Sequence, residues 1–277
     1  MTKTWFITGA SSGLGLEMTQ QLLAQGHKVI ATVRRPGTLT QLEQEYRKRL
    51  DTVQLDLVEP ESIVSAVEGA FKQHGRIDVI VSNAGYGLFG AAEELTNEDI
   101  DRQIATNLTG SIHLIRAALP RLRKQGGGRI VQVSSEGGQI AYPGFSLYHA
   151  TKWGIEGFLE AVAQEVAPFG IDVVIAEPGP TGTNFGANLV CAKPMDAYDE
   201  TPAGAVRRAI TGGSFEIKGD AARTVSAILS VAESEEPPLR LTLGSTAYSS
   251  ISKALSVRLS ALEAQRDVAD SADRQDL

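Results

Sequence analysis

The stretch Trp5-Phe-Ile-Thr8-Gly9-Ala-Ser-Ser-Gly13-Leu-Gly15 joins a short apolar run to a segment with apolar residues at helical spacing, which stops at Gly26. A strand, a glycine-rich turn and a helix in this order form an anion site. Glycines let the backbone approach a pyrophosphate, and the helix N-terminus presents free N–H groups. The spacing departs from the usual Gly-x-Gly-x-x-Gly, because three residues separate the first two glycines and one separates the last two. The stretch predicts a phosphate-binding turn at the start of an α/β fold.

Further apolar runs alternate with amphipathic stretches along the rest of the chain. Near-continuous apolar strands between helices are typical of a parallel sheet covered on both faces. We therefore expect a single-domain, Rossmann-type doubly wound parallel sheet, which binds ligands at the carboxyl ends of its strands. The expected strands are residues 5–8, 28–33, 52–56, 77–82, 129–134, 171–176 and 239–243, and the expected helices include 60–74, 98–124 and 220–233.

One domain is expected over residues 1–264, followed by a tail at 265–277. The tail is polar and dominated by charged and small residues, which predicts flexibility. Within the domain, residues 182–217 interrupt the alternation of strands and helices and are punctuated by glycine and proline. That pattern favours a loop that closes over a substrate.

The composition is ordinary for a globular protein, with 42 % apolar and 21 % charged residues among 277. A formal net charge of −7 argues against nucleic acid or an anionic membrane as the main partner. No apolar run nears the length needed to span a bilayer, and the first strand is expected almost at Met1, which leaves no room for a signal peptide. The lone cysteine, Cys191, excludes an internal disulfide, and the histidines lack metal-ligand spacing. We expect a cytoplasmic protein without a metal site.

A tyrosine and a lysine, Tyr148 and Lys152, stand four residues apart, and Ser135 lies thirteen residues before the tyrosine. Residues four apart share one face of a helix. A phenol with a pKa of about 10 is a poor base near neutrality. A cation a few ångströms away favours the phenolate and draws the pKa toward neutrality. The pair is therefore predicted to be a proton donor and its tuner, although the same spacing is also common on plain helix surfaces.

With these motifs the chain resembles the short-chain dehydrogenase/reductase family, whose fingerprint is Thr-Gly-x-x-x-Gly-x-Gly. The stretches Asn83–Gly90 and Gly179–Phe185 are similar to the branch that contains hydroxysteroid and retinol dehydrogenases. The resemblance implies a catalytic group of Asn107, Ser135, Tyr148 and Lys152. It also implies cofactor contacts from Gly9, Ser11, Ser12, Gly13, Leu14, Gly15, Asp56, Leu57, Asn83, Ala84, Gly85, Tyr148, Lys152, Pro178, Gly179, Thr181 and Thr183.

The chemistry implied by the resemblance is hydride transfer between a nicotinamide and a carbonyl or alcohol carbon. Tyr148 is expected to exchange the proton, and Ser135 to hydrogen-bond the same substrate oxygen. Lys152 is expected to lower the pKa of Tyr148 and to bond the nicotinamide ribose, while Asn107 holds a water of the proton relay. Ser134 is the rival of Ser135. Successive strand residues point to opposite faces, and the spacing to Tyr148 favours Ser135.

Three residues that follow the serine, Glu136, Gln139 and Tyr142, are candidates for lining the substrate cleft.

Cofactor choice is argued from the end of the second strand. A chain that binds NAD places an acid there for the ribose hydroxyls, whereas a 2′-phosphate needs a cationic partner. Here the strand ends in Arg34 and Arg35, with no acid. Two guanidiniums suit a doubly charged phosphate. We expect NADP(H), and the alternative is a solvated pair of loop arginines.

The predicted function is an NADP(H)-dependent oxidoreductase acting on a small-molecule alcohol or carbonyl substrate. The family resemblance also implies a homodimer or homotetramer. Two other functions stay open: a redox-sensing protein that binds NADP(H) without turnover, and an isomerase or dehydratase of related fold that uses the cofactor in an internal redox cycle.

Overall fold

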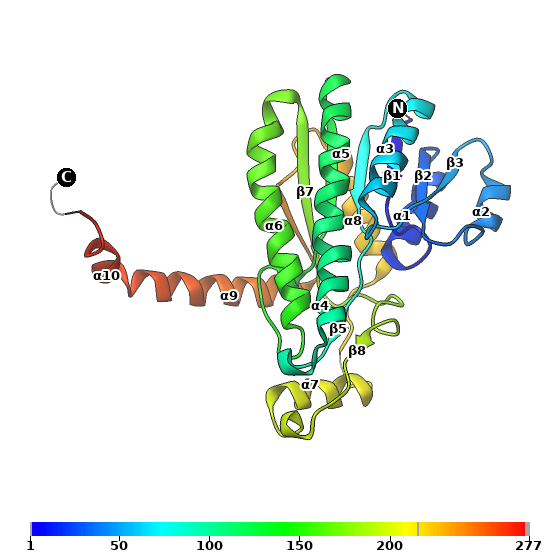
Figure 1. The fold of residues 1–277 in the computed structure, drawn as a ribbon. Helices are drawn as coiled ribbons and strands as arrows, with labels where there is room; N and C mark the ends of the chain where they lie inside the picture. Colours follow the sequence, from blue (N-terminus) through cyan, green and yellow to red (C-terminus); the bar gives the residue numbers. More distant parts are fainter. Residues whose placement is uncertain (1, 215, 275–277) are drawn as a thin grey trace.

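The computed structural model describes residues 2–214 and 216–274. A seven-stranded parallel sheet lies at its centre, in the order β3-β2-β1-β4-β6-β7-β9 (Figure 1). The expected doubly wound fold is therefore confirmed. The strands are β1 (Thr4–Ile7), β2 (Lys28–Val33), β3 (Leu50–Gln54), β4 (Val79–Ser82), β6 (Gly128–Val133), β7 (Ile171–Pro178) and β9 (Arg240–Leu243).

Helices cover both faces of this sheet. On one face pack α3 (Pro60–His74), α5 (Gly110–Lys124) and α6 (Ser146–Val166). On the other face pack α1 (Gly13–Ala24) and α8 (Ala221–Glu233), with the short α2 (Thr40–Glu45) beside β3. A 3-10 turn, η4 (Ala167–Phe169), extends the end of α6.

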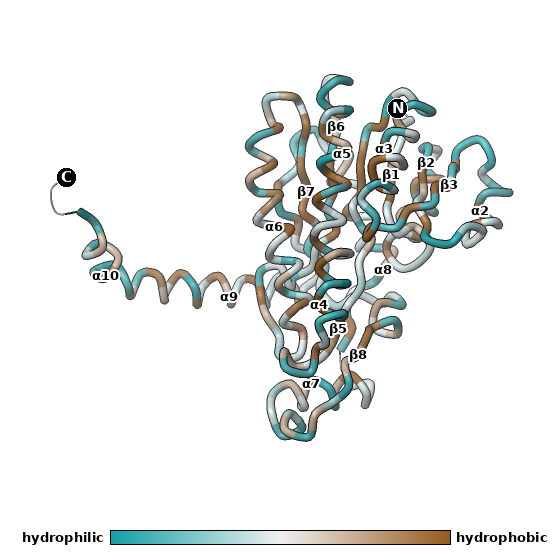
Figure 2. The backbone as a smooth tube through the Cα atoms, viewed as in Figure 1, coloured by the Kyte–Doolittle hydropathy of each residue, from teal (hydrophilic) through white to brown (hydrophobic). Residues whose placement is uncertain are grey.

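The two faces carry separate cores because side chains alternate along each strand. In β1, Trp5 and Ile7 face α1 and α8, whereas Phe6 faces α3, α5 and α6. All three side chains are fully buried. Figure 2 shows the hydrophobic residues concentrated in the central strands and on the helix sides that face them. The strands are apolar on both faces for this reason, as expected of a buried parallel sheet.

The predicted helix at 98–124 is wrong as a single element. It consists of α4 (Asn97–Ile104), a π-helical turn η2 (Ala105–Thr109) and α5. Side-chain hydroxyls add hydrogen bonds to carbonyls of this turn: the Thr109 Oγ1 donates to the Ala105 carbonyl at 3.2 Å, and the Ser111 Oγ donates to the Asn107 carbonyl at 3.2 Å. The turn places Asn107 in the interior.

The segment predicted to be a lid, residues 182–217, carries three short elements, and its residue 215 lies outside the described residues. They are β8 (Val190–Cys191), the 3-10 turn η5 (Asp196–Tyr198) and α7 (Pro202–Thr211). β8 pairs with β5 (Leu88–Phe89), which precedes the 3-10 turn η1 (Ala92–Glu94). The Arg207 guanidinium of α7 donates to both carboxylate oxygens of Glu94, whose side chain is fully buried. The segment is therefore anchored to the body of the protein at α7.

The chain ends in a helix that leaves the body. α9 (Ser245–Glu263) projects away from the sheet and is followed by α10 (Arg266–Asp270) (Figure 1). Only Ala247 and Ile251, near its start, are buried. The polar tail predicted at 265–277 includes α10, and its residues 275–277 lie outside the described ones. Among residues 2–214 and 216–274, none of the helices is long and apolar enough to cross a membrane.

Candidate active site

The glycine-rich turn connects β1 to α1 at the carboxyl edge of the sheet. Gly9 and Gly13 have φ angles of 67° and 54°, a region that side chains other than glycine rarely adopt. α1 begins at Gly13, and the side chain of the preceding Ser12 makes no capping hydrogen bond. The N–H groups of the first helical turn are therefore left for an anion, and the helix dipole favours a negative charge there.

Thr8 and Asn83 lock this turn to the end of β4. The Asn83 side-chain amide donates to the Thr8 carbonyl at 2.9 Å, while the Thr8 Oγ1 accepts from the Asn83 and Ala84 backbone N–H groups at 2.9 and 3.0 Å. A Cβ at Gly15 would overlap the Gly9 carbonyl and lie 2.5 Å from the Asn83 amide nitrogen. Only glycine fits at position 15. Of the residues in this junction, Thr8 was not among the expected site residues.

The catalytic side chains expected from the sequence converge beside this turn. Tyr148 and Lys152 lie on α6, and the Lys152 Nζ is 5.6 Å from the centre of the Tyr148 ring. Ser135 is the second residue after β6. It caps the 3-10 turn η3 (Glu136–Gly138), where its hydroxyl oxygen accepts a hydrogen bond from the Gly137 N–H at 3.1 Å. The Ser135 hydroxyl also lies close enough to the Tyr148 phenol to lower the pKa of that phenol. The arrangement brings a hydroxyl, a phenol and an ammonium group together at the carboxyl edge of the sheet.

In the chain by itself, the pKa of Tyr148 is not drawn toward neutrality, contrary to the expectation from the sequence. Burial raises the pKa of Tyr148 to about 12, although the hydrogen bond from Ser135 opposes the shift. Burial also lowers the pKa of Lys152 to about 8, against the attraction of Glu156. The Lys152 ammonium donates to the Val133 carbonyl at 2.9 Å. The protein's own groups thus keep the phenol protonated, because burial outweighs the effect of Ser135.

The two serines play different parts. The Ser134 Oγ donates to the buried Glu156 carboxylate at 2.5 Å. Ser135 is the one that meets Tyr148. This geometry agrees with the assignment by spacing.

Asn107 lies in the π-helical turn and is buried. Its side chain bonds the backbone of Tyr86 twice, accepting from the N–H at 3.1 Å and donating to the carbonyl at 2.8 Å. A Cβ on Gly85 would lie 3.2 Å from the Asn107 Oδ1. Asn107 therefore holds the segment that follows Asn83-Ala84-Gly85, a role that the sequence did not indicate.

The loop expected at the nicotinamide end follows β7. Gly179 donates its N–H to the Leu243 carbonyl at 3.0 Å, which ties the loop to β9. The Thr181 hydroxyl donates to the Gly179 carbonyl at 2.8 Å. Thr183 lies close to the glycine-rich turn, since a Cβ added to Gly13 would be 3.9 Å from the Cβ of Thr183. Pro178, Gly179, Thr181 and Thr183 thus lie at the same edge as the turn.

Four further expected residues lie at the ends of β2 and β3. Arg34 and Arg35 follow β2 and are exposed. Within residues 2–214 and 216–274, neither guanidinium has an ion-pair partner. Asp56 accepts from the Val58 N–H at 3.2 Å, and Leu57 packs into the core on the α3 side. The two arginines therefore remain available to an anion.

The three residues considered for the wall of the substrate cleft, Glu136, Gln139 and Tyr142, make hydrogen bonds within the protein. Glu136 is buried and accepts a hydrogen bond from the Tyr142 hydroxyl at 2.7 Å, while the Gln139 amide donates to Glu177 at 2.8 Å. They hold the loop together. The sequence missed Phe185 of the lid segment, whose ring centre lies 5.8 Å from that of Tyr148.

Comparison with known proteins decides the family. Residues 3–193 match the family model described as short chain dehydrogenase. The chain belongs to the short-chain dehydrogenase family. Members are oxidoreductases that use a nicotinamide cofactor, so the chain is an oxidoreductase of this family.

Three relatives show how far the similarity extends. Oxidoreductase BOA17 of Botryotinia fuckeliana is 38 % identical over 270 residues, which cover 97 % of this chain and 98 % of that protein. Human 17-beta-hydroxysteroid dehydrogenase type 1 is 34 % identical over 204 residues, covering 70 % of this chain and 61 % of that protein. The crystal structure of a short-chain dehydrogenase from Streptomyces avermitilis superposes with a TM-score of 0.92 at 36 % identity, covering 99 % of this chain and all of that one.

We predict that Gly15→Ala weakens nicotinamide cofactor binding and destabilises the fold by about 1–3 kcal/mol, because the added methyl group must displace Gly9 or Asn83. Calorimetric titration with NADPH and NADH, together with urea unfolding, measures both effects. Gly157→Ala is the matched control, because nothing lies within 4 Å of a Cβ at that exposed helical position. It should bind cofactor normally and gain up to about 1 kcal/mol from helix propensity. An unchanged cofactor affinity in Gly15→Ala would contradict the role of the turn.

Proposed function

We propose that the protein transfers a hydride between NADP(H) and the carbon of a carbonyl or secondary alcohol substrate, with Tyr148 as general acid and base. The observation that carries the proposal is the meeting of the Tyr148 phenol, the Ser135 hydroxyl and the Lys152 ammonium beside a glycine-rich turn. Catalysis of this kind needs a positioned proton donor and a second donor for the same oxygen.

The residues fit the cofactor. The free first turn of α1 suits the pyrophosphate, and the close packing at Gly9 and Gly15 leaves the turn without side chains that would obstruct it. Arg34 and Arg35 are exposed guanidiniums at the end of β2, where the adenosine 2′-phosphate of NADP(H) is expected. Asn83 and Thr183 border the same cleft. When bound, the cofactor supplies or accepts the hydride.

The proton chemistry falls to Tyr148. Because burial raises its pKa to about 12, the phenol is protonated near neutrality and suited to donate a proton to a carbonyl oxygen. Ser135 hydrogen-bonds that oxygen and fixes it within reach of the phenol. Lys152, whose pKa lies at about 8, stays largely charged at neutral pH and stabilises the phenolate that forms.

The substrate side is lined by aromatic rings. Phe145 and Phe185 lie 6.3 and 5.8 Å from Tyr148, centre to centre, and Phe89 lies 5.1 Å from Phe145. Such walls favour an apolar carbonyl compound. Phe185 belongs to residues 182–217, which we propose to close over the bound substrate.

Replacing Tyr148 by Phe removes the proton donor without changing the shape of the site. We expect turnover to fall by about a hundredfold to ten-thousandfold, the range for a lost general acid, while NADPH affinity stays close to that of the wild type. The assay follows NADPH absorbance with aldehydes, ketones, steroids and quinones, and calorimetry measures binding. A variant that keeps more than a tenth of the wild-type turnover would exclude Tyr148 from the role.

Cofactor preference is tested without any substrate. One charge-assisted hydrogen bond contributes about 1.5–3 kcal/mol, so NADPH should bind about tenfold to a hundredfold more tightly than NADH. Arg34→Asp should erase or reverse that preference, because the carboxylate repels the phosphate but accepts hydrogen bonds from free ribose hydroxyls. Calorimetric titrations with both cofactors measure it. If wild-type protein binds NADH as tightly as NADPH, Arg34 and Arg35 are only solvated loop charges.

A further inference from the structure

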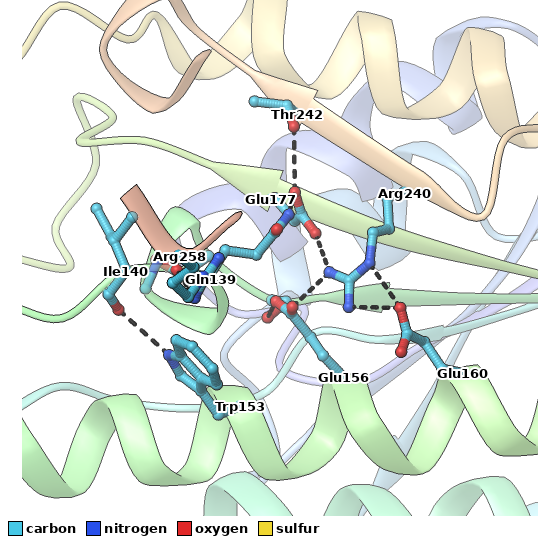
Figure 3. A network of polar contacts seen from close by, with 12 residues as sticks. Gln139, Ile140, Trp153, Glu156, Glu160, Glu177, Arg240, Thr242 and Arg258 are labelled. Atoms are coloured by element: carbon cyan, nitrogen blue, oxygen red, sulfur yellow. Dashed lines mark hydrogen bonds and ion pairs between the residues drawn. The ribbon is translucent and has the colours of Figure 1, made fainter. Parts of the chain in front are cut away.

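A buried charge network lies behind the serine segment, which we define as residues 134–140. Arg240, the first residue of β9, places its guanidinium against three carboxylates (Figure 3). It pairs with Glu156 at 2.6 Å, with Glu160 at 2.9 Å and with Glu177. The side chains of Glu156 and Glu177 are 1 % and 0 % exposed, and both pair directly with this guanidinium, while the Lys152 ammonium also attracts Glu156.

Each of the two buried carboxylates also accepts a hydrogen bond from one end of the serine segment. The Ser134 hydroxyl, directly before Ser135, donates to Glu156 at 2.5 Å. The Gln139 amide, at the end of η3, donates to Glu177 at 2.8 Å, and the Thr242 hydroxyl of β9 donates to the same carboxylate at 3.1 Å. One cation therefore holds two anions, and the anions hold the two ends of the turn that begins at Ser135.

The backbone of the segment is shaped to meet these carboxylates. A Cβ at Gly138 would overlap the Glu156 carboxylate, so the turn can approach it only as glycine. On the outer side, the Ile140 carbonyl accepts from the Trp153 indole at 3.3 Å and the Gln139 carbonyl accepts from Arg258 of α9 at 2.8 Å (Figure 3). The Arg258 contact is exposed and the Trp153 contact is half-buried, whereas the Ser134–Glu156 contact is buried and the Gln139–Glu177 contact is half-buried.

We propose that Arg240 is a positioning residue of the active site, which acts through Glu156 and Glu177 to fix the Ser135 hydroxyl against Tyr148. Arg240 itself touches neither Ser135 nor Tyr148. The inference rests on the proposed function, because the serine hydroxyl matters only if it meets a substrate oxygen. Displacing a reacting group by a fraction of an ångström to one ångström lowers turnover by up to about a hundredfold.

Loss of the guanidinium has a defined pH dependence. Burial raises the pKa of Glu156, and hydrogen bonds from Ser134 and Arg240 oppose that shift. Without Arg240 the pKa of Glu156 rises further, because a hydrogen bond and an attraction that oppose the shift are lost. At low pH a protonated carboxyl still accepts the serine-segment hydrogen bonds. As pH rises toward the raised pKa of Glu156, its carboxylate forms without the guanidinium and repels Glu177, so folding stability and the position of the segment are lost together.

Other titratable groups lie around Glu156 and Glu177, and their charges contribute to the pH dependence of these two carboxyl groups. They are Lys152, Tyr148 and Glu160 on α6, Glu136 in the serine segment and Arg258 on α9. All of them remain in a variant of Arg240, so any new pH dependence arises from the lost guanidinium.

The test compares Arg240→Met with Arg129→Met in the full-length protein. Arg129, at the start of β6, also pairs with an acid, Asp172, and caps the end of α8 through the Ala232 and Ser234 carbonyls, but it lies at the opposite end of the strand from Ser135.

The probe is the carbonyl compound that the wild type reduces fastest with NADPH. For Arg240→Met we expect turnover reduced by about tenfold to a hundredfold at pH 8, with the loss shrinking toward pH 6. NADPH affinity should stay within twofold of the wild type. Arg129→Met should keep the wild-type turnover and pH profile.

Two further variants keep the test decisive. Arg240→Met combined with Glu156→Gln removes one of the two carboxylates that lost the guanidinium, and with it their mutual repulsion, but keeps an acceptor for Ser134, so its turnover should exceed that of Arg240→Met above pH 8. If Arg240→Met does not fold, Ser134→Ala combined with Gln139→Ala cuts both links while leaving the ion pairs intact, and it should lose turnover with normal NADPH binding. Wild-type turnover and pH profile in Arg240→Met, or in the serine and glutamine double variant, would overturn the proposal.

Amide hydrogen exchange separates this proposal from the proposed function. Peptides covering residues 134–140 should exchange faster in Arg240→Met than in the wild type, increasingly so from pH 6 to pH 9 after correction for the intrinsic rate. If the wild type reduces no carbonyl compound, the proposed function fails, and faster exchange in the variant still supports the positioning contact. Equal exchange in the two proteins at both pH values would overturn it.

Discussion

The hydrogen bonds between Asn83 and Thr8 are the junction from which the rest of the site is built. They hold the ends of β1 and β4 together at the carboxyl edge, and the glycine-rich turn passes so close to them that Gly15 has no room for a side chain. On one side of the junction the turn presents the free first turn of α1. On the other side, Asn107 fastens the segment after Gly85 through the backbone of Tyr86. A half-buried polar contact between strands thus holds the glycine-rich turn and the segment after Gly85 at one edge of the sheet.

A second set of buried polar contacts supports the catalytic side. Ser134 directly follows β6, β7 ends in Glu177-Pro178, and α6 supplies Lys152 and Glu156 one helical turn apart. Burying three ionisable groups in this region costs free energy unless they are paired. The Lys152 ammonium meets a backbone carbonyl, and the two acids meet Arg240. The same burial that raises the pKa of Tyr148 to about 12 makes the placement of these charges consequential.

Much of this organisation was predictable, because it depends on neighbours in the sequence. The alternation of apolar runs with amphipathic stretches predicted the parallel sheet. The bounds of α3 and β2 agree with the expected 60–74 and 28–33. The four-residue spacing of Tyr148 and Lys152 placed them on one helix face. The Arg240–Glu156 pair spans 84 residues and could not be read from any local pattern. Glu177 inside the apolar run of β7 was the one signal available, since a buried strand tolerates an acid only when it is paired. The π-helical turn at Asn107 and the projecting α9 depend on hydroxyl contacts and on tertiary docking, which hydrophobic periodicity does not report.

The central claim is that the site performs hydride transfer coupled to proton donation from Tyr148. It is tested most directly by incubating the wild type with NADPH deuterated at the transferring position of the nicotinamide and a panel of aldehydes, ketones, steroids and quinones. Mass spectrometry of the product then follows the label, while absorbance follows NADPH. We predict one deuterium on the carbinol carbon of the product alcohol for each NADPH oxidised. Product formed without net NADPH oxidation, or NADPH bound but unconsumed across the panel, would contradict the claim, the first favouring an internal redox cycle and the second a sensing protein.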